Sequence, residues 1–432
     1  MPPSLMRFSS KPTTKQPHPS SLAYVAIPDE FDSITSKANS TAESGTEFYD
    51  RSLTSRRYAL TGVAFSSIFG ISCLITGTVI IATRGGNGAL QHEFTSYMQK
   101  DMLALVLNLI VTLCTESTGF VHGISLRFAL ASESRLRFNT NLRLLTAARG
   151  WRNPNGSLLN TIMAVLLILS YTSASLVVLS STGLDGSSGV TVQVYYVCIT
   201  GLPLFLLGVT LLLQVVITLS GMRAVKILTW SSSSLDATAA LLHHMQLSPL
   251  AFRCMRGASD ADVFGDPAKP SKTQPSAWCA HPSIRKVVLS LWGLFVACAV
   301  WATVTTLAWS ITVGPDSPVP SGSWSFFPNE NSSNVLWWFF RLDGDVSVQW
   351  WILSYVNVAL VQGPLTLGMH CSELVANAIR DERQWRCASG RKGLRMATNP
   401  LKSVLTNPFG LVLFVAKFVL RESFTLTSDR YP

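Results

Sequence analysis

Six long apolar runs alternate with connections that are by turns rich and poor in arginine, and this alternation constrains the fold more than any other feature of the chain. A helix needs about 20 mostly apolar residues to cross the hydrocarbon core of a bilayer. A buried helix of a soluble protein could account for one such run, but not for six. We therefore predict an all-α, polytopic transmembrane helix bundle with six spans. The runs are 58–82, 102–122, 158–180, 191–220, 286–313 and 348–370.

The positions of lysine and arginine predict which side of the membrane each connection occupies, because cytosolic loops retain these residues. The second and fourth connections and the C-terminal tail are rich in them, whereas the other three connections hold only Arg84, Lys100 and Arg341. Both termini are therefore predicted to be cytosolic. The basic residues behind the net charge of +10 are spread over the predicted cytosolic segments and are not concentrated in one folded module. Nucleic acid is therefore not an expected partner.

Composition divides the chain into three parts. Residues 1–57 are rich in Ser, Thr and Pro and are predicted to form a disordered cytosolic tail. Residues 58–370 form the transmembrane domain, which includes a mostly irregular cytosolic loop at 222–285. Residues 371–432 form a basic cytosolic tail. Within it, the apolar stretch 408–420 is predicted to be an interfacial helix, and a seventh span is the alternative.

The outer connections fit a protein of the plasma membrane or of a secretory pathway membrane. Asn331 begins a glycosylation sequon in the fifth connection, and we predict that it carries a glycan. The sequons at Asn39 and Asn155 lie on the predicted inner side and should stay bare. None of the eight cysteines falls in a predicted outer loop, so no structural disulfide is expected.

Polar residues repeat at helical spacing in the even-numbered runs, which places each set on one face of its helix. Polar groups in hydrocarbon are costly and normally face the bundle interior or a wet cavity. One interpretation is a shared polar path for a small ion or solute; the other is hydrogen bonding that only joins helices, at about 0.6 kcal/mol each. The candidate residues are Asn108, Thr112, Glu116 and His122 in the second run, Thr210, Gln214 and Thr218 in the fourth, and Gln362, Thr366 and His370 in the sixth.

Glu116 is the most distinctive of these residues, because it is an acid inside an otherwise uncharged span. An ionisable group at that depth is a functional candidate by default. In the path interpretation it is a cation or proton site.

The first run instead repeats small residues, at Gly62, Ser66, Gly70 and Gly77. Small side chains let another helix backbone approach closely. We predict that this face is a packing seam. Ser170, Ser173 and Ala174 are predicted to play the same part in the third run, and Ser290, Gly293 and Ala297 in the fifth.

The cytosolic connections favour lipid contact over chemistry. Phe138, Leu142 and Leu145 lie on one helical face among arginines, and they predict an amphipathic helix that binds the anionic lipids of the inner leaflet. No metal site or cofactor is predicted, because the His and Cys residues of the fourth connection lack paired ligand spacing. The motifs G-x-S-x-G, H-E-x-x-H and G-x-x-x-x-G-K-[ST] do not occur, so an enzyme is not favoured.

Four phrases carry a family resemblance: FNTNLRLLT, TWSSSSLD, HPSIRKVVLSLW and QGPLTLGMHCSELV. They resemble an uncharacterised family of multi-pass membrane proteins from filamentous fungi, over about residues 58–400. The resemblance implies a fungal source and a recurring membrane architecture. It implies no activity, ligand or catalytic residue, because the family has no assigned function.

Two functions are compatible with these observations. The first is a transporter or channel-like bundle for a small ion or solute. The alternative is a non-transporting membrane scaffold or sensor, which binds lipid or a protein partner through its basic cytosolic loops. Only the first requires Glu116 and the polar residues of the sixth run.

Overall fold

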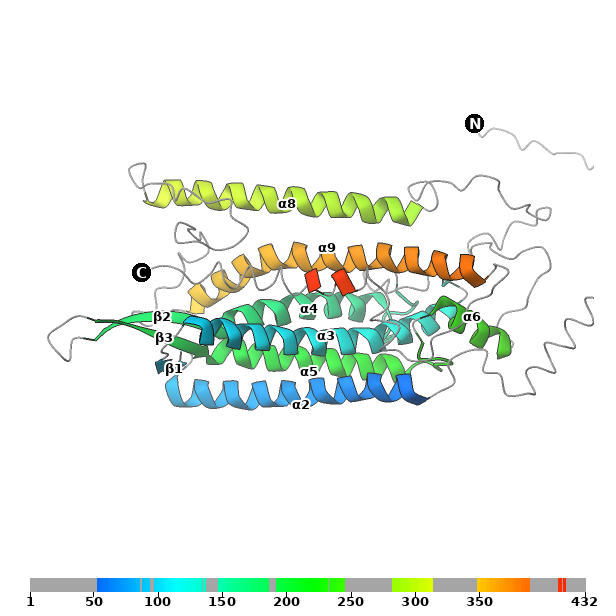
Figure 1. Ribbon diagram of the computed structural model, residues 1–432, viewed down its shortest axis with the longest axis horizontal. Coiled ribbons are helices and arrows are strands. Elements are labelled where there is room, and N and C mark those ends of the chain that lie inside the picture. The colour runs from blue at the N-terminus through cyan, green and yellow to red at the C-terminus, as the bar shows by residue number, and fades with distance from the viewer. Residues whose placement is uncertain are drawn as a thin grey trace, which may run out of the picture. The chain divides into compact units, whose positions relative to one another are not determined.

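The computed structural model describes eleven stretches of the chain, which are mostly helical and all belong to the unit that spans residues 49–432. They are 53–85, 88–93, 97–133, 135–136, 147–185, 192–231, 233–244, 282–313, 348–388, 411–413 and 415–416. The helices are α2 (Leu53–Arg84), α3 (Tyr97–Ser132), α4 (Ser157–Val177), α5 (Gly201–Arg223), α6 (Ser234–His243), α8 (Pro282–Val313) and α9 (Val348–Ala388). The strands are β1 (Ala89–Glu93), β2 (Val178–Asp185) and β3 (Val192–Thr200) (Figure 1).

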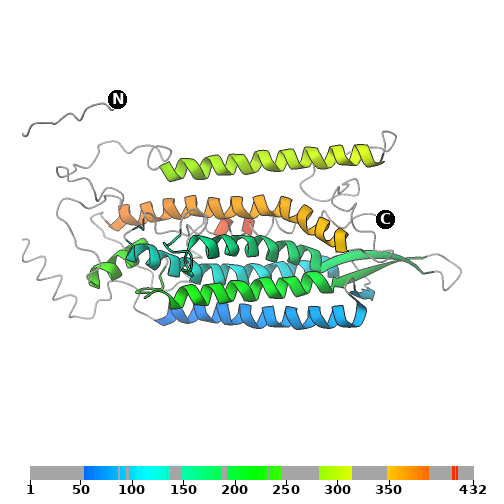
Figure 2. The same ribbon diagram turned by 180° about the vertical axis from the view of Figure 1, so that it is seen from behind.

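Helices α2, α3, α4 and α5 form one bundle, which Figures 1 and 2 show from opposite sides. Helix α5 packs against the other three, and α4 also packs against α9, which in turn contacts α8. The core of the bundle contains Val111, Leu207 and Leu211, which are fully buried. In this arrangement α4 lies between the bundle core and α9.

Four of the described helices, α2 to α5, are long and apolar enough to cross a membrane. Large apolar side chains also cover outward faces of the helices. Ile68 and Ile75 of α2 are exposed, and Trp292 and Phe295 of α8 are 65% and 67% exposed. Exposed apolar faces of this extent suit contact with lipid rather than with water. The described helices therefore fit a membrane protein.

The predicted packing seam on α2 is confirmed. Ser66 Oγ donates a hydrogen bond to the Cys114 carbonyl of α3 at 3.2 Å. A Cβ atom built on Gly77 would lie 2.5 Å from the backbone nitrogen of Phe205 in α5. From the other side, a Cβ on Gly208 would lie 2.6 Å from the backbone nitrogen of Leu74. Glycine at these positions lets the two backbones approach closely. The packing seam predicted for the fifth run is not found among the described residues, because Ser290, Gly293 and Ala297 of α8 are exposed.

A three-stranded antiparallel sheet lies at one end of the bundle, which we call the sheet end. Its strand order is β1-β3-β2. Strand β2 continues directly from α4, and β3 leads directly into α5. Strand β1, from the connection between α2 and α3, pairs with β3 from Ala89 opposite Thr200 to Glu93 opposite Tyr196. The sheet thereby joins the α2–α3 hairpin to the α4–α5 hairpin at the sheet end.

The sheet corrects the prediction that every element is helical. The predicted span 191–220 is a helix only from Gly201, because residues 192–200 form β3. The predicted span 158–180 likewise ends as a helix at Val177. Residues 192–200 read VQVYYVCIT, and β-branched and aromatic residues favour strands. Hydropathy alone cannot separate such a strand from the apolar helix that follows it.

Several helices extend beyond the predicted spans. Helix α2 begins at Leu53, so residues 53–57 of the predicted disordered tail are helical. Helix α3 continues past residue 122 to Ser132, and α9 continues through Pro364 and past residue 370 to Ala388. Helix α6 lies within the loop that was predicted to be mostly irregular. A hydropathy profile detects only the apolar part of a helix. Polar residues with high helix propensity, such as Arg, Glu and Gln, extend the helix beyond that part.

Some predicted features lie outside the described residues. They include the tail up to residue 52, the amphipathic segment with Phe138, Leu142 and Leu145, the sequon at Asn331, and residues 245–281 and 389–410. Within the predicted interfacial helix 408–420, residues 411–413 and 415–416 are helical.

Candidate functional site

One face of α3 is polar and fully buried. Its residues follow one another at intervals of three or four, the spacing that aligns side chains along one side of a helix. Each of them is at most 3% exposed. We call this set the buried polar stripe: Asn108, Thr112, Thr115, Thr118, His122 and Ser125.

Most hydroxyl groups of the stripe bond to the backbone of their own helix. Thr112 Oγ1 donates to the Asn108 carbonyl at 2.7 Å, and Thr118 Oγ1 donates to the Cys114 carbonyl at 3.0 Å. Such bonds satisfy a buried hydroxyl without water. Thr115 differs, because its Oγ1 also lies 2.8 Å from the hydroxyl of Tyr171 and thereby joins α3 to α4.

Residues 170–175 of α4 form a polar centre that contacts three neighbouring helices. Beyond the contact between Tyr171 and α3, Ser170 Oγ accepts from Gln214 Nε2 of α5 at 3.4 Å. On the opposite side, Tyr355 OH of α9 donates to Ser173 Oγ at 3.3 Å. Sequence reasoning took this segment only as a packing seam. The available signal was the run SYTSAS, which places small polar groups on every face of the helix.

The candidate residues of α5 all lie in the bundle interior. Gln214 Nε2 also donates to the Leu166 carbonyl of α4 at 3.1 Å. Thr218 Oγ1 donates to the Thr118 carbonyl of α3 at 3.4 Å, and Thr210 Oγ1 donates to the Leu207 carbonyl of its own helix. The structure therefore brings the candidate sets of the second and fourth runs together.

Among the candidate residues of α9, Gln362 contacts the polar centre of α4. Gln362 is buried, and its Nε2 donates to Ser175 Oγ. Thr366 and His370 are partly exposed. His370 Nδ1 lies 3.4 Å from Glu373 Oε2, one turn further along the same helix.

His122 lies in a buried cluster at the end of the bundle opposite the sheet. We call this the basic end, because α3 and α5 finish there near Arg127 and Arg223. His122 Nε2 donates to Asn160 Oδ1 of α4 at 2.6 Å, and both side chains are buried. A neutral imidazole with one ring N–H can make this bond, so burial of His122 requires no charge.

Asn155 holds the basic end together, and sequence reasoning saw it only as a bare sequon. It is fully buried; its Oδ1 accepts from Ser125 Oγ of α3 at 3.0 Å, and its Nδ2 donates to the Gly221 carbonyl of α5 at 3.2 Å. A Cβ on Gly221 would lie 2.9 Å from Asn155 Oδ1, so the glycine leaves room for the amide. The turn sequence Asn-Pro-Asn-Gly was the available signal.

Arg127 was predicted among the basic residues of a cytosolic connection, but it is buried at the basic end. Its guanidinium donates to the Ser231 carbonyl at 2.8 Å. Asp381 of α9 interacts electrostatically with Arg127 and Arg380. Burial raises the pKa of Asp381 to about 6, and the two arginines oppose that rise. These contacts join α3, the connection after α5, and α9.

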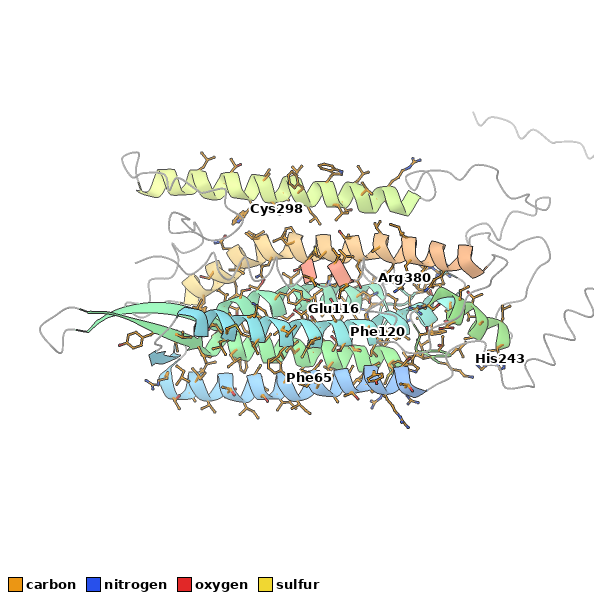
Figure 3. All side chains as sticks on the ribbon, viewed as in Figure 1. Phe65, Glu116, Phe120, His243, Cys298 and Arg380 are labelled. Carbon is orange, nitrogen blue, oxygen red and sulfur yellow. The ribbon has the colours of Figure 1, made fainter. Side chains whose placement is uncertain are left out.

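Glu116 lies on a different face of α3 from the buried polar stripe. Leu109, Leu113 and Phe120 are exposed, and with Glu116 they occupy the positions i, i+4, i+7 and i+11 of one helix face. Glu116 itself is partly exposed (Figure 3). The structure thus separates it from Asn108 and the other buried candidates of its helix.

The fourth connection contributes one described pair of histidines. The rings of His243 and His244 lie edge to face at the end of α6, with centroids 5.2 Å apart. Cys254, Cys279 and His281 of the same connection lie outside the described residues.

Comparisons with known proteins find no matching family model, no matching curated protein and no matching solved structure.

Proposed function

We propose that the protein conducts a small ion or solute across a membrane along the buried polar stripe of α3. The observation that carries the proposal is the length of the stripe. From Asn108 to Ser125 it extends about 25 Å at the rise of an α-helix. The hydrocarbon core of a bilayer is about 30 Å thick. A few polar contacts are enough to hold a helix bundle together. A polar face that extends over most of the thickness of the hydrocarbon core exceeds that need.

The contacts of the stripe support the same proposal. Gln214, Thr218 and the polar centre of α4 lie against it and supply side-chain amides and hydroxyls from two further helices. His122 is the one titratable side chain of the stripe, and its imidazole ring can both donate and accept a hydrogen bond. Glu116 lies on the face of α3 that carries Leu109, Leu113 and Phe120, and it is not part of the proposed path.

We also propose the topology of six spans with both termini in the cytosol. The fifth and sixth spans would lie in α8 and α9, each longer than a bilayer requires. The basic end would then face the cytosol. There Trp151 is 73% exposed between Arg149 and Arg152, which are exposed too. This group suits the headgroup region of a leaflet rich in anionic lipids, in the plasma membrane or a secretory pathway membrane.

A second candidate function is a membrane scaffold or sensor without transport. The observation that favours it is that Thr112 and Thr118 bond to their own backbone, so the stripe needs no water to be satisfied. In that case the polar contacts only join the helices, and binding would occur through the basic cytosolic loops. The family resemblance to fungal multi-pass membrane proteins is compatible with either function.

Flux through proteoliposomes distinguishes the two. The purified full-length protein is reconstituted with internal pyranine and exposed to a proton gradient with valinomycin and K⁺; Na⁺ flux and glycerol-driven swelling are measured in parallel. We expect flux above that of empty vesicles for at least one of these probes. Replacing His122 with Phe should reduce it several-fold.

A matched pair of threonines controls for general effects. Thr118 and Thr303 both donate to the carbonyl four residues earlier, but Thr118 is buried in the stripe whereas Thr303 is exposed on α8. Thr118→Val should reduce flux and Thr303→Val should leave it unchanged. Folded protein that conducts none of the probes, or equal effects of the two variants, would favour the scaffold.

A further inference from the structure

The basic end holds a charge cluster that is separate from the buried polar stripe. Arg127 lies on α3 beyond Ser125, the last residue of the stripe, and Arg380 and Asp381 are adjacent on α9, with Arg380 labelled in Figure 3. Arg127 interacts electrostatically with both of them. Arg127 is 9% exposed, and the side chains of Arg380 and Asp381 are 23% and 13% exposed. We call these three residues the arginine cluster.

The charges of the arginine cluster do not balance. Two guanidinium groups and one ionised carboxylate leave a net positive charge. The nearby helix α6 carries Asp236 in its first turn, but among the described residues this acid forms no ion pair with either arginine. A buried charge without a counterion is costly. An anion bound at the cluster would remove that cost.

The hydrogen bonds of the cluster are incomplete as well. A guanidinium group has five N–H donors. Arg127 donates through Nη1 to the Ser231 carbonyl, but its Nε is buried and has no hydrogen-bond partner among the described residues. Arg380 Nε lies 3.7 Å from Asp381 Oδ1, a distance too long for a hydrogen bond. The cluster therefore has N–H donors that a ligand with several acceptor oxygens can use.

This chemistry favours a phosphate group as the ligand. A planar guanidinium group donates two parallel hydrogen bonds to a phosphate, and a phosphate has enough oxygens to serve two arginines at once. A chloride ion would use fewer of the donors. The partial exposure of Arg380 leaves one side of the cluster accessible from outside the bundle. A basic pocket between helices on the cytosolic side is also a common place for phospholipid headgroups to bind.

We propose that the arginine cluster binds a phosphate group through the guanidinium groups of Arg127 and Arg380. The phosphate belongs either to the headgroup of an anionic phospholipid or to a soluble phosphate compound. Asp381 limits the affinity, because its carboxylate competes for the same donors. The bound phosphate joins α3 to α9. The site lies beyond the end of the buried polar stripe, so the inference does not depend on conduction along it.

Thermal unfolding of the purified full-length protein tests the proposal without any measurement of flux. The protein is kept in detergent free of phospholipid at slightly alkaline pH, and Tm is followed by tryptophan fluorescence. The added ligands are inorganic phosphate, dioctanoyl phosphatidic acid and dioctanoyl phosphatidylcholine, with chloride at the same ionic strength as the salt control. A ligand that binds only the folded state raises Tm as its concentration increases. We expect a saturable rise of several degrees with phosphatidic acid, with inorganic phosphate or with both, and no rise with phosphatidylcholine.

The two active ligands distinguish the source of the phosphate. A rise with phosphatidic acid but not with inorganic phosphate supports the proposal and assigns the site to a lipid headgroup. A rise with inorganic phosphate supports it too, and shows that a soluble phosphate compound is sufficient. A natural chain whose Tm responds to neither ligand would overturn the proposal.

Substitutions of two neighbouring residues should change the affinity in opposite directions. Arg380→Gln removes charged donors and should raise the half-maximal ligand concentration about tenfold. Asp381→Asn removes the competing carboxylate and should lower that concentration several-fold. Arg223→Gln is the matched control, because it removes the same charge from an exposed position at the basic end and should leave the concentration unchanged. If the cluster is only a structural ion pair, the first two variants lower Tm but respond to the ligands as the natural chain does, and the proposal is wrong.

Discussion

Replacement of Gly208 by alanine is the sharpest test of the packing between α2 and α5. A Cβ at this position would lie 2.6 Å from the Leu74 nitrogen, 2.7 Å from the Gly70 carbonyl oxygen and 2.9 Å from the Leu74 Cα. All three are backbone atoms and cannot rotate away. Ordinary carbon contacts begin near 3.4 Å, so the two helices must separate by an appreciable fraction of an ångström along their whole seam.

The expected cost follows from two opposing effects. Forcing an extra methyl group into a well-packed interface costs about 1–3 kcal/mol. Alanine is favoured over glycine in a helix by up to about 1 kcal/mol, which offsets part of that cost. We therefore expect Gly208→Ala to lower the free energy of unfolding by about 1–2 kcal/mol.

Gly293 of α8 provides the matched control. A Cβ built there meets no atom within 4 Å among the described residues. Gly293→Ala then gains only the helix propensity of alanine, and stability should rise slightly. The same substitution in two helices is thus expected to change stability in opposite directions.

Thermal and denaturant unfolding of both variants can be followed by the fluorescence of the 12 tryptophans in one detergent or nanodisc. The reasoning is wrong if Gly208→Ala is as stable as Gly293→Ala. It is also wrong if Gly208→Ala destabilises while Gly77→Ala, about one helical turn along the same seam, does not.

Three further predictions concern the basic end and the topology. Because the pKa of Asp381 is raised to about 6 from 3.8, the folded protein keeps a proton that the unfolded chain loses between these values. The free energy of unfolding should fall as pH rises through that window, by at most about 3 kcal/mol, and Asp381→Asn should flatten the profile. Asn155→Ala removes two buried hydrogen bonds and should destabilise the protein by about 1–3 kcal/mol, measured by thermal unfolding. Asn331→Gln should abolish the shift in gel mobility that a glycosidase produces, whereas Asn155→Gln should not affect it.

Each of these predictions has a distinct contrary result. A pH profile that is identical in Asp381→Asn would mean that another group titrates in the window. If Asn155→Ala is as stable as the natural chain, water must replace the amide group, and this would contradict the full burial of the site. A glycosidase shift that survives Asn331→Gln and disappears with Asn155→Gln would invert the proposed topology.

The sequence predicted the helical, membrane-compatible character and the α2 seam because both depend on local patterns. Long apolar runs define helices whatever they pack against, and small residues at Gly70 and Gly77 permit close approach in any partner arrangement. The strands were missed because hydropathy treats Val192–Thr200 and the following helix as one apolar run. Burial of Arg127 was equally hidden, because its neighbours Ser231 and Asp381 come from distant parts of the chain.

The candidate site was predictable residue by residue but not as an arrangement. Asn108, Thr112, His122, Thr210, Gln214 and Thr218 were identified from spacing, and the structure buries all six in one interior. Spacing could not show that Glu116 lies on another face. A residue near the edge of a polar face is buried or exposed according to which helix packs beside it, and spacing does not give that information. Nor could it show that α4 connects α9 to the interior.

The pairing of β1 with β3 bears on how the protein is made. Strand β1 leaves the ribosome directly after α2, but its partner follows only after α3, α4 and β2 have been synthesised. The first helical hairpin is therefore synthesised before β1 has a partner strand, and the backbone groups of β1 stay open to chaperones or to other nascent chains. This period ends when β3 is synthesised and pairs with β1. A chain that terminates before residue 192 should therefore be recognised by quality control through its unpaired strand edge.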